Sequence, residues 1–236
     1  MKIYLLIAAF CALPFNVIAA ERKPVADIDT NAMTSEMQAI TQEENSKHVS
    51  LAWWMPTEFW QASFAKSSET PASLNKDVAE AFSGVSVIAI AEADISSLAS
   101  FDFYSREDVE KNLVVTYVDS QGTQHVLQAE NKINRKLEVL LGIMKPILAS
   151  AVGNLGSNLN FYVFHDMAPS DKHARLIDPY SSGYIDVQFT TKLGMVNHSR
   201  IQLPLDSLFV PRMCPGGRKA HITWKYCPWD GTPLND

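Results

Sequence analysis

Histidine and carboxylate side chains gather where an apolar segment of the sequence enters a polar loop. His165 and Asp166 end the segment, and His173 follows in the loop. Imidazole and carboxylate groups can bind a metal or move protons, so these three residues are the candidates for catalysis. Their spacing matches no catalytic motif, and most polar loop residues do no chemistry. A non-catalytic interpretation is therefore favoured, with a hydrolase or metal-dependent enzyme using these residues as the alternative.

A second candidate group is aromatic. Trp53, Trp54 and Trp60 lie close together in the sequence and flank Glu58. An exposed aromatic patch with one carboxylate would suit a sugar or peptide ligand. Packing in the core is the favoured interpretation, because buried aromatic side chains dominate small cores. Neighbours on a strand point to opposite faces, so Trp53 and Trp54 are expected in different layers.

The first twenty residues have the pattern of a secretory signal peptide. Lys2 precedes an apolar stretch, and small residues follow it, which predicts cleavage near Ala19 or Ala20 and removal of Cys11. The expected product is a soluble periplasmic or secreted protein, since no later stretch is long and apolar enough to span a membrane. A net charge of −6 without basic runs argues against nucleic acid and against an anionic lipid surface. The expected partner is a protein, peptide or sugar of unknown identity.

The C-terminal tail contains two short motifs that begin with Cys-Pro. They are Cys214-Pro-Gly-Gly and Cys227-Pro-Trp-Asp-Gly. Within residues 214–231 only, they resemble the two knuckles of a zinc ribbon, whose usual form is Cys-Pro-x-Cys-Gly twice. Gly217 and Asp230 stand where the second cysteine of each knuckle belongs, so half of the ligands are missing.

Three states of the tail cysteines follow from these motifs. A disulfide between Cys214 and Cys227 is favoured, because an even cysteine pair in an exported protein usually pairs. The loop it closes would contribute on the order of 3 kcal/mol in the chain-entropy model. A remade zinc site would add His221 and Asp230 to the two thiolates, and free thiols are the third state. Three aromatic residues are expected to pack the tail onto the main body: Trp224, Tyr226 and Trp229.

A long apolar helix is predicted over residues 133–151. Apolar residues recur at steps of three and four, and Val139 and Ile143 widen the stripe, so cover on more than one side is expected. Pro146 predicts a kink or break. After a glycine-containing turn, residues 159–164 read as a strand buried on both faces.

The remaining pattern predicts an α+β fold with a mixed or antiparallel sheet packed on one long central helix. Strands are expected at 49–55 and 85–91, and hairpins at 113–129 and 184–205. Glu92 and Asp94 follow one strand, but a ligand site there would need a parallel sheet. Four regions are expected: a signal peptide (1–20), a polar N-terminal arm (21–47), an α+β domain (48–210) and a cysteine-stapled or zinc-ribbon-like tail (211–236).

These observations favour an exported binding or scaffolding module that is not an enzyme and needs no cofactor. The enzyme using His165, Asp166 and His173 is one alternative. A zinc-binding module built on the tail is the other.

Overall fold

The computed structural model describes residues 20–41, 47–66, 72–98, 100–130, 132–169, 171 and 174–234. The predicted leader, apart from Ala20, and the candidate His173 lie outside the described residues. None of the described helices is long and apolar enough to cross a membrane.

The first sheet has five antiparallel strands built around one long strand, β3 (Val85–Ile95). It contains four further strands: β1 (Gln38–Thr41), β2 (His48–Trp54), β4 (Phe101–Phe103) and β7 (Asn160–His165). One edge of β3 pairs with β2, while its other edge pairs first with β7 and then with β4. This antiparallel arrangement excludes the parallel-sheet site considered for Glu92 and Asp94.

The second sheet has four antiparallel strands in the order β6-β5-β8-β9. Its strands are β5 (Leu113–Val118), β6 (Gln124–Val126), β8 (Gly183–Thr190) and β9 (Val196–Leu203). Both predicted hairpins are present, although β9 begins earlier than the sequence pattern indicated. Alternating burial along β9 shows that one of its faces packs inward and the other meets solvent.

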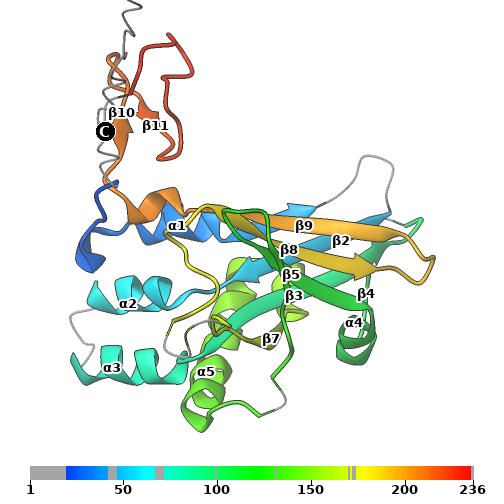
Figure 1. The fold of residues 1–236 in the computed structure, drawn as a ribbon. Helices are drawn as coiled ribbons and strands as arrows, with labels where there is room; N and C mark the ends of the chain where they lie inside the picture. The colour runs from blue at the N-terminus through cyan, green and yellow to red at the C-terminus, as the bar shows by residue number, and fades with distance from the viewer. Residues whose placement is uncertain are drawn as a thin grey trace, which may run out of the picture.

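The two sheets meet along both of their sides. On one side, residues 127–130, which follow β6, bond to both sheets. The Leu127 amide donates to the Val115 carbonyl of β5 (2.8 Å), and the Glu130 amide donates to the Val163 carbonyl of β7 (2.8 Å). On the opposite side, the Ser199 hydroxyl of β9 donates to the Ser50 hydroxyl of β2 (3.0 Å). The apolar faces of both sheets therefore share one core (Figure 1).

Six α-helices surround these sheets in the described parts of the chain. They are α1 (Thr30–Glu36), α2 (Thr57–Ala65), α3 (Ala72–Ala81), α4 (Arg106–Asn112), α5 (Arg135–Ala151) and α6 (Asn154–Ser157), with 3-10 turns η1 (Val25–Asp27) and η2 (Asp206–Leu208). Figure 1 shows α2, α3 and α5 grouped beside the strands. The α+β class with antiparallel sheets is thus confirmed, whereas organisation around one central helix is not.

The longest helix, α5, is covered on one side only. Leu137 and Leu141 are buried, whereas Val139 and Ile143 are 56% and 59% exposed. Two positions along a helix correspond to a rotation of about 200°, which carries these side chains to the opposite face. The prediction that the helix is covered on more than one side is therefore wrong. The helix also continues through Pro146 without the predicted break.

The tail forms a small unit that projects from the sheets (Figure 1) and packs onto the main core through Ile222. It contains β10 (Arg212–Met213) and β11 (Lys219–Ala220), and the predicted disulfide joins Cys214 to Cys227, whose Cα atoms are 5.6 Å apart. Its core holds little more than the two cysteines, Ala220 and the partly buried Leu234.

The tail aromatics do not pack onto the main body. Trp224, Tyr226 and Trp229 are 43%, 62% and 52% exposed. The prediction that they attach the tail to the body is therefore wrong. A core this small has no room for three large rings, so they stay at the surface.

Candidate functional site

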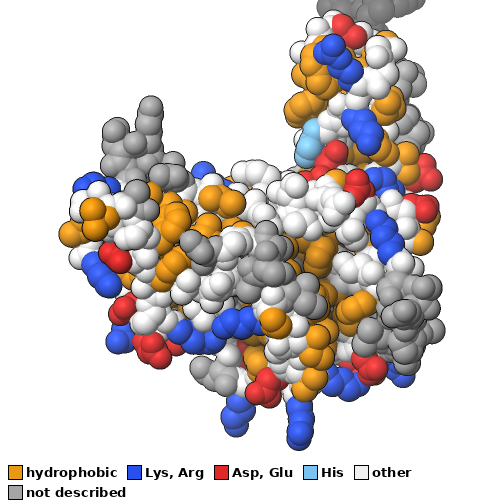
Figure 2. Space-filling model, turned by 180° about the vertical axis from the view of Figure 1, so that it is seen from behind, with side chains coloured by type: hydrophobic (Ala, Val, Ile, Leu, Met, Phe, Trp, Pro, Cys, Tyr) orange, Lys and Arg blue, Asp and Glu red, His pale blue; other side chains and the backbone are white. Residues whose placement is uncertain are grey.

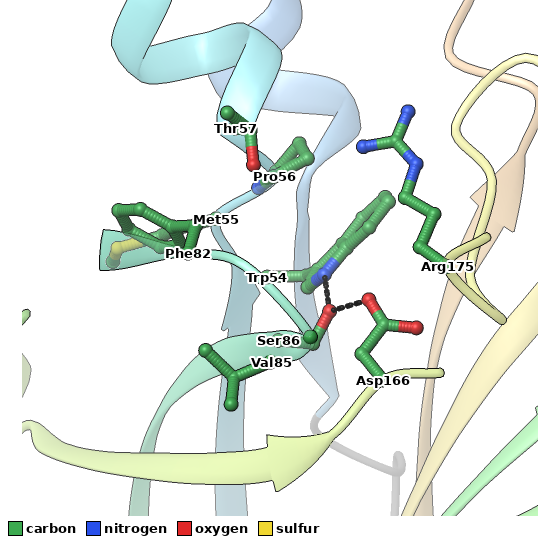
Figure 3. Close-up of a pocket in the computed structure, with 10 residues that line it drawn as sticks. Trp54, Met55, Pro56, Thr57, Phe82, Val85, Ser86, Asp166 and Arg175 are labelled. Carbon is green, nitrogen blue, oxygen red and sulfur yellow. Dashed lines mark hydrogen bonds between the residues drawn. The ribbon is translucent and has the colours of Figure 1, made fainter. Parts of the chain in front are cut away.

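Asp166 lies in a pocket formed where three strand ends converge. β3 pairs with both β2 and β7, so Trp54 from β2, Ser86 from β3 and Asp166 just after β7 come together. The Asp166 carboxylate accepts a hydrogen bond from the Ser86 hydroxyl (2.7 Å), whose oxygen accepts one from the Trp54 indole N–H (3.1 Å). Figure 3 shows both bonds and the side chain of Arg175 at the same pocket.

The second oxygen of Asp166 holds the following loop. It accepts hydrogen bonds from the backbone amides of Leu176 (3.0 Å) and Ile177 (2.8 Å). Burial raises the pKa of Asp166, and the hydrogen bonds from Ile177 and Ser86 oppose that rise. Both carboxylate oxygens thus accept hydrogen bonds from the protein, and those from Leu176 and Ile177 anchor the loop.

An ion pair attaches the same loop to α2. The guanidinium of Arg175 donates to both oxygens of Glu58, at 3.0 and 2.5 Å, and lies 3.7 Å from Asp178. This two-pronged geometry fixes orientation as well as charge. Glu58, one of the candidate binding residues, therefore binds Arg175 from the polar loop.

Size argues against a ligand inside this pocket. Its volume of about 30 Å³ is of the order of one water molecule. A neighbouring hollow of about 300 Å³ shares Thr57, Phe82, Gly84, Asp166 and Arg175 with it. That volume is at the lower limit of roughly 300–1,000 Å³ for small-molecule sites, and both of its charged residues already have partners.

The catalytic candidates are not brought to one place. The His165 ring is half-exposed, and its Nδ1 lies 2.9 Å from the Glu130 carboxylate, whereas Asp166 is buried against Ser86. Neighbouring residues at a strand end point to opposite faces, so His165 and Asp166 diverge. His173 is not among the described residues.

The three tryptophans of the binding candidates lie in the core. Trp53, Trp54 and Trp60 are 1–2% exposed, so they form no exposed aromatic patch. All seven residues of β2 are buried, since both faces of this strand are covered. The Trp60 ring meets Phe59 edge to face at 5.4 Å and lies tilted against Phe82 at 5.7 Å, which joins α2 to the residues after α3. These contacts are core packing, the interpretation that the sequence favoured.

A buried polar network between the two sheets was not foreseen. The Nε2 atom of His48 lies 2.8 Å from Glu92, and its Nδ1 atom lies 2.8 Å from Asp94. Ser50 donates to Glu92 (2.7 Å) and Tyr104 donates to Asp94 (2.8 Å). His48 is 44 positions or more from both carboxylates, so only the pairing of β2 with β3 brings them together.

A larger groove lies between α4, β5, residues 126–130 and β7. Its volume is about 460 Å³, within the range of small-molecule sites, and we call it the Tyr162 groove. Its surface is about equally polar and apolar, and β5 and β7 supply much of the apolar part. Its polar residues are Arg106, Glu110, Gln128, Glu130 and Tyr162.

Tyr162 is the distinctive residue of this groove. It is 5% exposed, and its hydroxyl has no hydrogen-bond partner among the residues that the structure describes. The guanidinium of Arg106 lies 5.2 Å from the ring centroid. Burial raises the pKa of Tyr162 to about 12, so the hydroxyl is a donor at neutral pH. Buried hydroxyls are nearly always hydrogen-bonded, so this one indicates a position for an acceptor.

The groove continues toward α5. A second hollow of about 330 Å³ shares Arg106, Glu130 and Val163 with it and extends to Leu141 and Lys145. Glu130, which pairs with His165, lines both. No sequence pattern marks this site, because its residues occupy ordinary strand and helix positions and come together only when the two sheets are joined.

The residues proposed as zinc ligands do not form a metal site. Both cysteine sulfurs are in the disulfide, the His221 Nδ1 atom lies 2.8 Å from the Thr223 hydroxyl, and Asp230 accepts from the Thr232 amide (2.9 Å). Across the described ranges, no three His, Cys, Asp or Glu side chains are placed to hold a metal ion.

No protein-family model, curated protein or solved structure matches the chain.

Proposed function

We propose that this is an exported binding protein that takes a small ligand in the Tyr162 groove. The observation that carries the proposal is the buried Tyr162 hydroxyl, a hydrogen-bond donor without a described partner in a hollow of ligand size. The signal-peptide pattern and the disulfide support export.

The groove residues favour an uncharged ligand that combines apolar groups with a carbonyl oxygen. Tyr162 supplies a donor to that oxygen, and the apolar strand residues cover the rest. Arg106 forms an ion pair with Glu110 (2.8 Å), so the second carboxylate of the groove, Glu130, is the one that would repel a ligand carboxylate. Short apolar peptides combine a neutral carbonyl with apolar bulk, so they are the proposed ligand class.

Calorimetric titration with short leucine-rich peptides, blocked at both ends, tests the proposal. We expect Tyr162→Phe to weaken binding by about five- to tenfold, because one hydrogen bond is lost. The same change should stabilise the unliganded protein by about 1 kcal/mol, since it removes an unpaired buried hydroxyl. A gain in stability with a loss of affinity distinguishes a binding role from a structural one.

Two comparisons sharpen that experiment. Peptides with a free carboxylate should bind more weakly than blocked ones, because the Glu130 carboxylate would repel them. Val114→Trp should fill the groove, whereas Val139→Trp on the exposed face of α5 should leave binding unchanged. Tyr226→Phe, which replaces an exposed tyrosine, is the matched control for Tyr162→Phe. If no blocked peptide binds, or if Tyr162→Phe and Val114→Trp bind as well as the unmodified protein, the proposal fails.

The alternative is a hydrolase or metal-dependent enzyme that uses His165, Asp166 and His173. The raised pKa of Asp166 beside a hollow is the observation that favours it. The divergence of His165 from Asp166 and the occupied oxygens of Asp166 count against it. Turnover that is lost in Asp166→Asn would establish this alternative in place of the binding protein.

A further inference from the structure

The projecting tail exposes aromatic rings that lie in contact with one another. Trp224 and Trp229 meet edge to face with ring centroids 6.5 Å apart, and His221 lies 6.0 Å from Trp224. The guanidinium of Arg218 lies 5.3 Å from the ring of Trp229. We call these four residues the tail patch. Large exposed aromatic clusters are uncommon on soluble proteins and mark surfaces that bind something.

Basic side chains surround the tail patch. Arg212 donates to the Trp224 carbonyl (2.7 Å), and Lys219 and Lys225 are exposed nearby in the sequence. Residues 211–236 carry four Lys or Arg against two Asp or Glu, whereas residues 1–210 carry sixteen against twenty-four. The tail therefore carries a positive net charge, although the net charge of the whole chain is negative. Figure 2 shows basic and hydrophobic side chains side by side on the projecting tail.

The disulfide keeps this surface assembled. It joins the two ends of the segment that carries Arg218, His221 and Trp224, and Trp229 lies two residues after Cys227. Backbone bonds from Cys214 to Arg218 and from Cys227 to Thr232 hold the adjoining turns. The rings are therefore presented by a fixed backbone and not by a loose terminus.

We propose that the tail patch docks on an anionic lipid surface. Tryptophan rings favour the headgroup level of a bilayer, where one end of the ring meets hydrocarbon and the other meets water. Lysine and arginine add attraction to anionic headgroups. The acidic body does not prevent docking, because charges farther than about 8 Å away are largely screened at physiological ionic strength. The net charge of the chain is thus a poor guide to this partner.

Sedimentation with phosphatidylcholine vesicles, with and without phosphatidylglycerol, tests the proposal on the mature protein. The unmodified protein should bind only the vesicles that contain phosphatidylglycerol and should dissociate as salt rises. The double variant Arg218→Gln/Lys219→Gln should partition about tenfold or more weakly, since two cationic contacts are lost. Trp224→Ser/Trp229→Ser should abolish binding at physiological salt.

Matched variants on the body are the controls. Lys132→Gln/Arg135→Gln removes two exposed charges, and Leu193→Ser removes an apolar side chain that is 83% exposed. Both should bind as the unmodified protein does. The mass of each tail variant, before and after reduction, establishes that its disulfide has formed. Equal binding to neutral vesicles, binding unaffected by the tail variants, or no vesicle binding at low salt would each overturn the proposal. The last outcome would favour a protein interface, whose binding hot spots are also rich in Trp and Arg.

Discussion

At the scale of single residues, His48 has the most unusual environment. Its ring stacks on Phe189 at 5.5 Å, and each ring nitrogen faces a carboxylate. Burial alone would lower the pKa of His48, but its hydrogen bonds to the Glu92 and Asp94 carboxylates reverse this and raise it. Burial also raises the pKa of Glu92. Both groups hold protons more tightly in the folded state than in the unfolded state. Both therefore stabilise the folded protein more at low pH than at high pH.

The stability contribution of His48 should therefore depend on pH. A pKa raised by folding gives stability that is complete below the unfolded value of about 6.5 and is lost as pH rises through the folded value. We expect His48→Asn to lower the free energy of unfolding by about 3 kcal/mol in mildly acidic solution, because a buried charge pair is broken. The deficit should shrink at alkaline pH.

Urea unfolding of both proteins across this pH range measures the difference. His198→Asn is the control, since its ring is 43% exposed and its pair with Asp186 at the surface is worth about 1 kcal/mol or less. A His48→Asn deficit that does not change with pH would contradict the assignment.

At the scale of elements, the faces of α5 separate residues that the sequence placed together. Leu137 and Ile143 are both apolar residues of the predicted stripe, yet one is fully buried and the other is 59% exposed. The stripe is wider than the surface that covers it. The apolar side chains left uncovered, Val139 and Ile143, face solvent. Their sequence neighbours Glu138 and Gly142 line the hollow that extends from the Tyr162 groove.

Alanine substitution should reveal this difference. Leu137→Ala should lower the free energy of unfolding by about 2–5 kcal/mol, because it leaves a cavity in the core. Ile143→Ala should change it by about 0.5 kcal/mol or less, because the side chain already meets water. Urea unfolding followed by circular dichroism measures both. Equal losses would mean that α5 is covered on both faces after all.

At the scale of the whole molecule, the N-terminal end of the described chain meets the segment that leads into the tail. The Lys23 amide donates to the Leu208 carbonyl (2.9 Å), the Val210 amide donates to the Glu21 carbonyl (2.8 Å), and Arg22 lies over the ring of Tyr180 at 3.9 Å. The segment directly after the predicted cleavage site therefore supports the base of the tail. Met33 and Met37, in the predicted polar arm, are also fully buried in the core.

The mass of the protein taken from its own cell envelope tests both ends of this arrangement. We expect a chain that begins at Ala20 or Glu21, with a denatured mass two hydrogens short of the reduced form, because Cys214 and Cys227 are joined. Reductant should restore those hydrogens. An intact leader would contradict export, and two free thiols with one zinc bound natively would revive the zinc-binding alternative.

The sequence by itself determined the local structure of this protein. Both hairpins, the long helix and the strand at Asn160–His165 follow from hydrophobic periodicity and turn residues, which act over a few positions. The pairing of Cys214 with Cys227 follows from their number and the inferred compartment.

Only the tertiary structure decided which surfaces and sites those elements form. Ser86 contacts Asp166, and His48 contacts Glu92, although tens of residues separate the partners in the sequence. Both contacts depend on strand order and register. The exposure of Ile143 and Trp224, and the buried hydroxyl of Tyr162, depend equally on what packs against them. Shifting a strand by one residue would turn every side chain to its other face, so local patterns cannot specify these contacts.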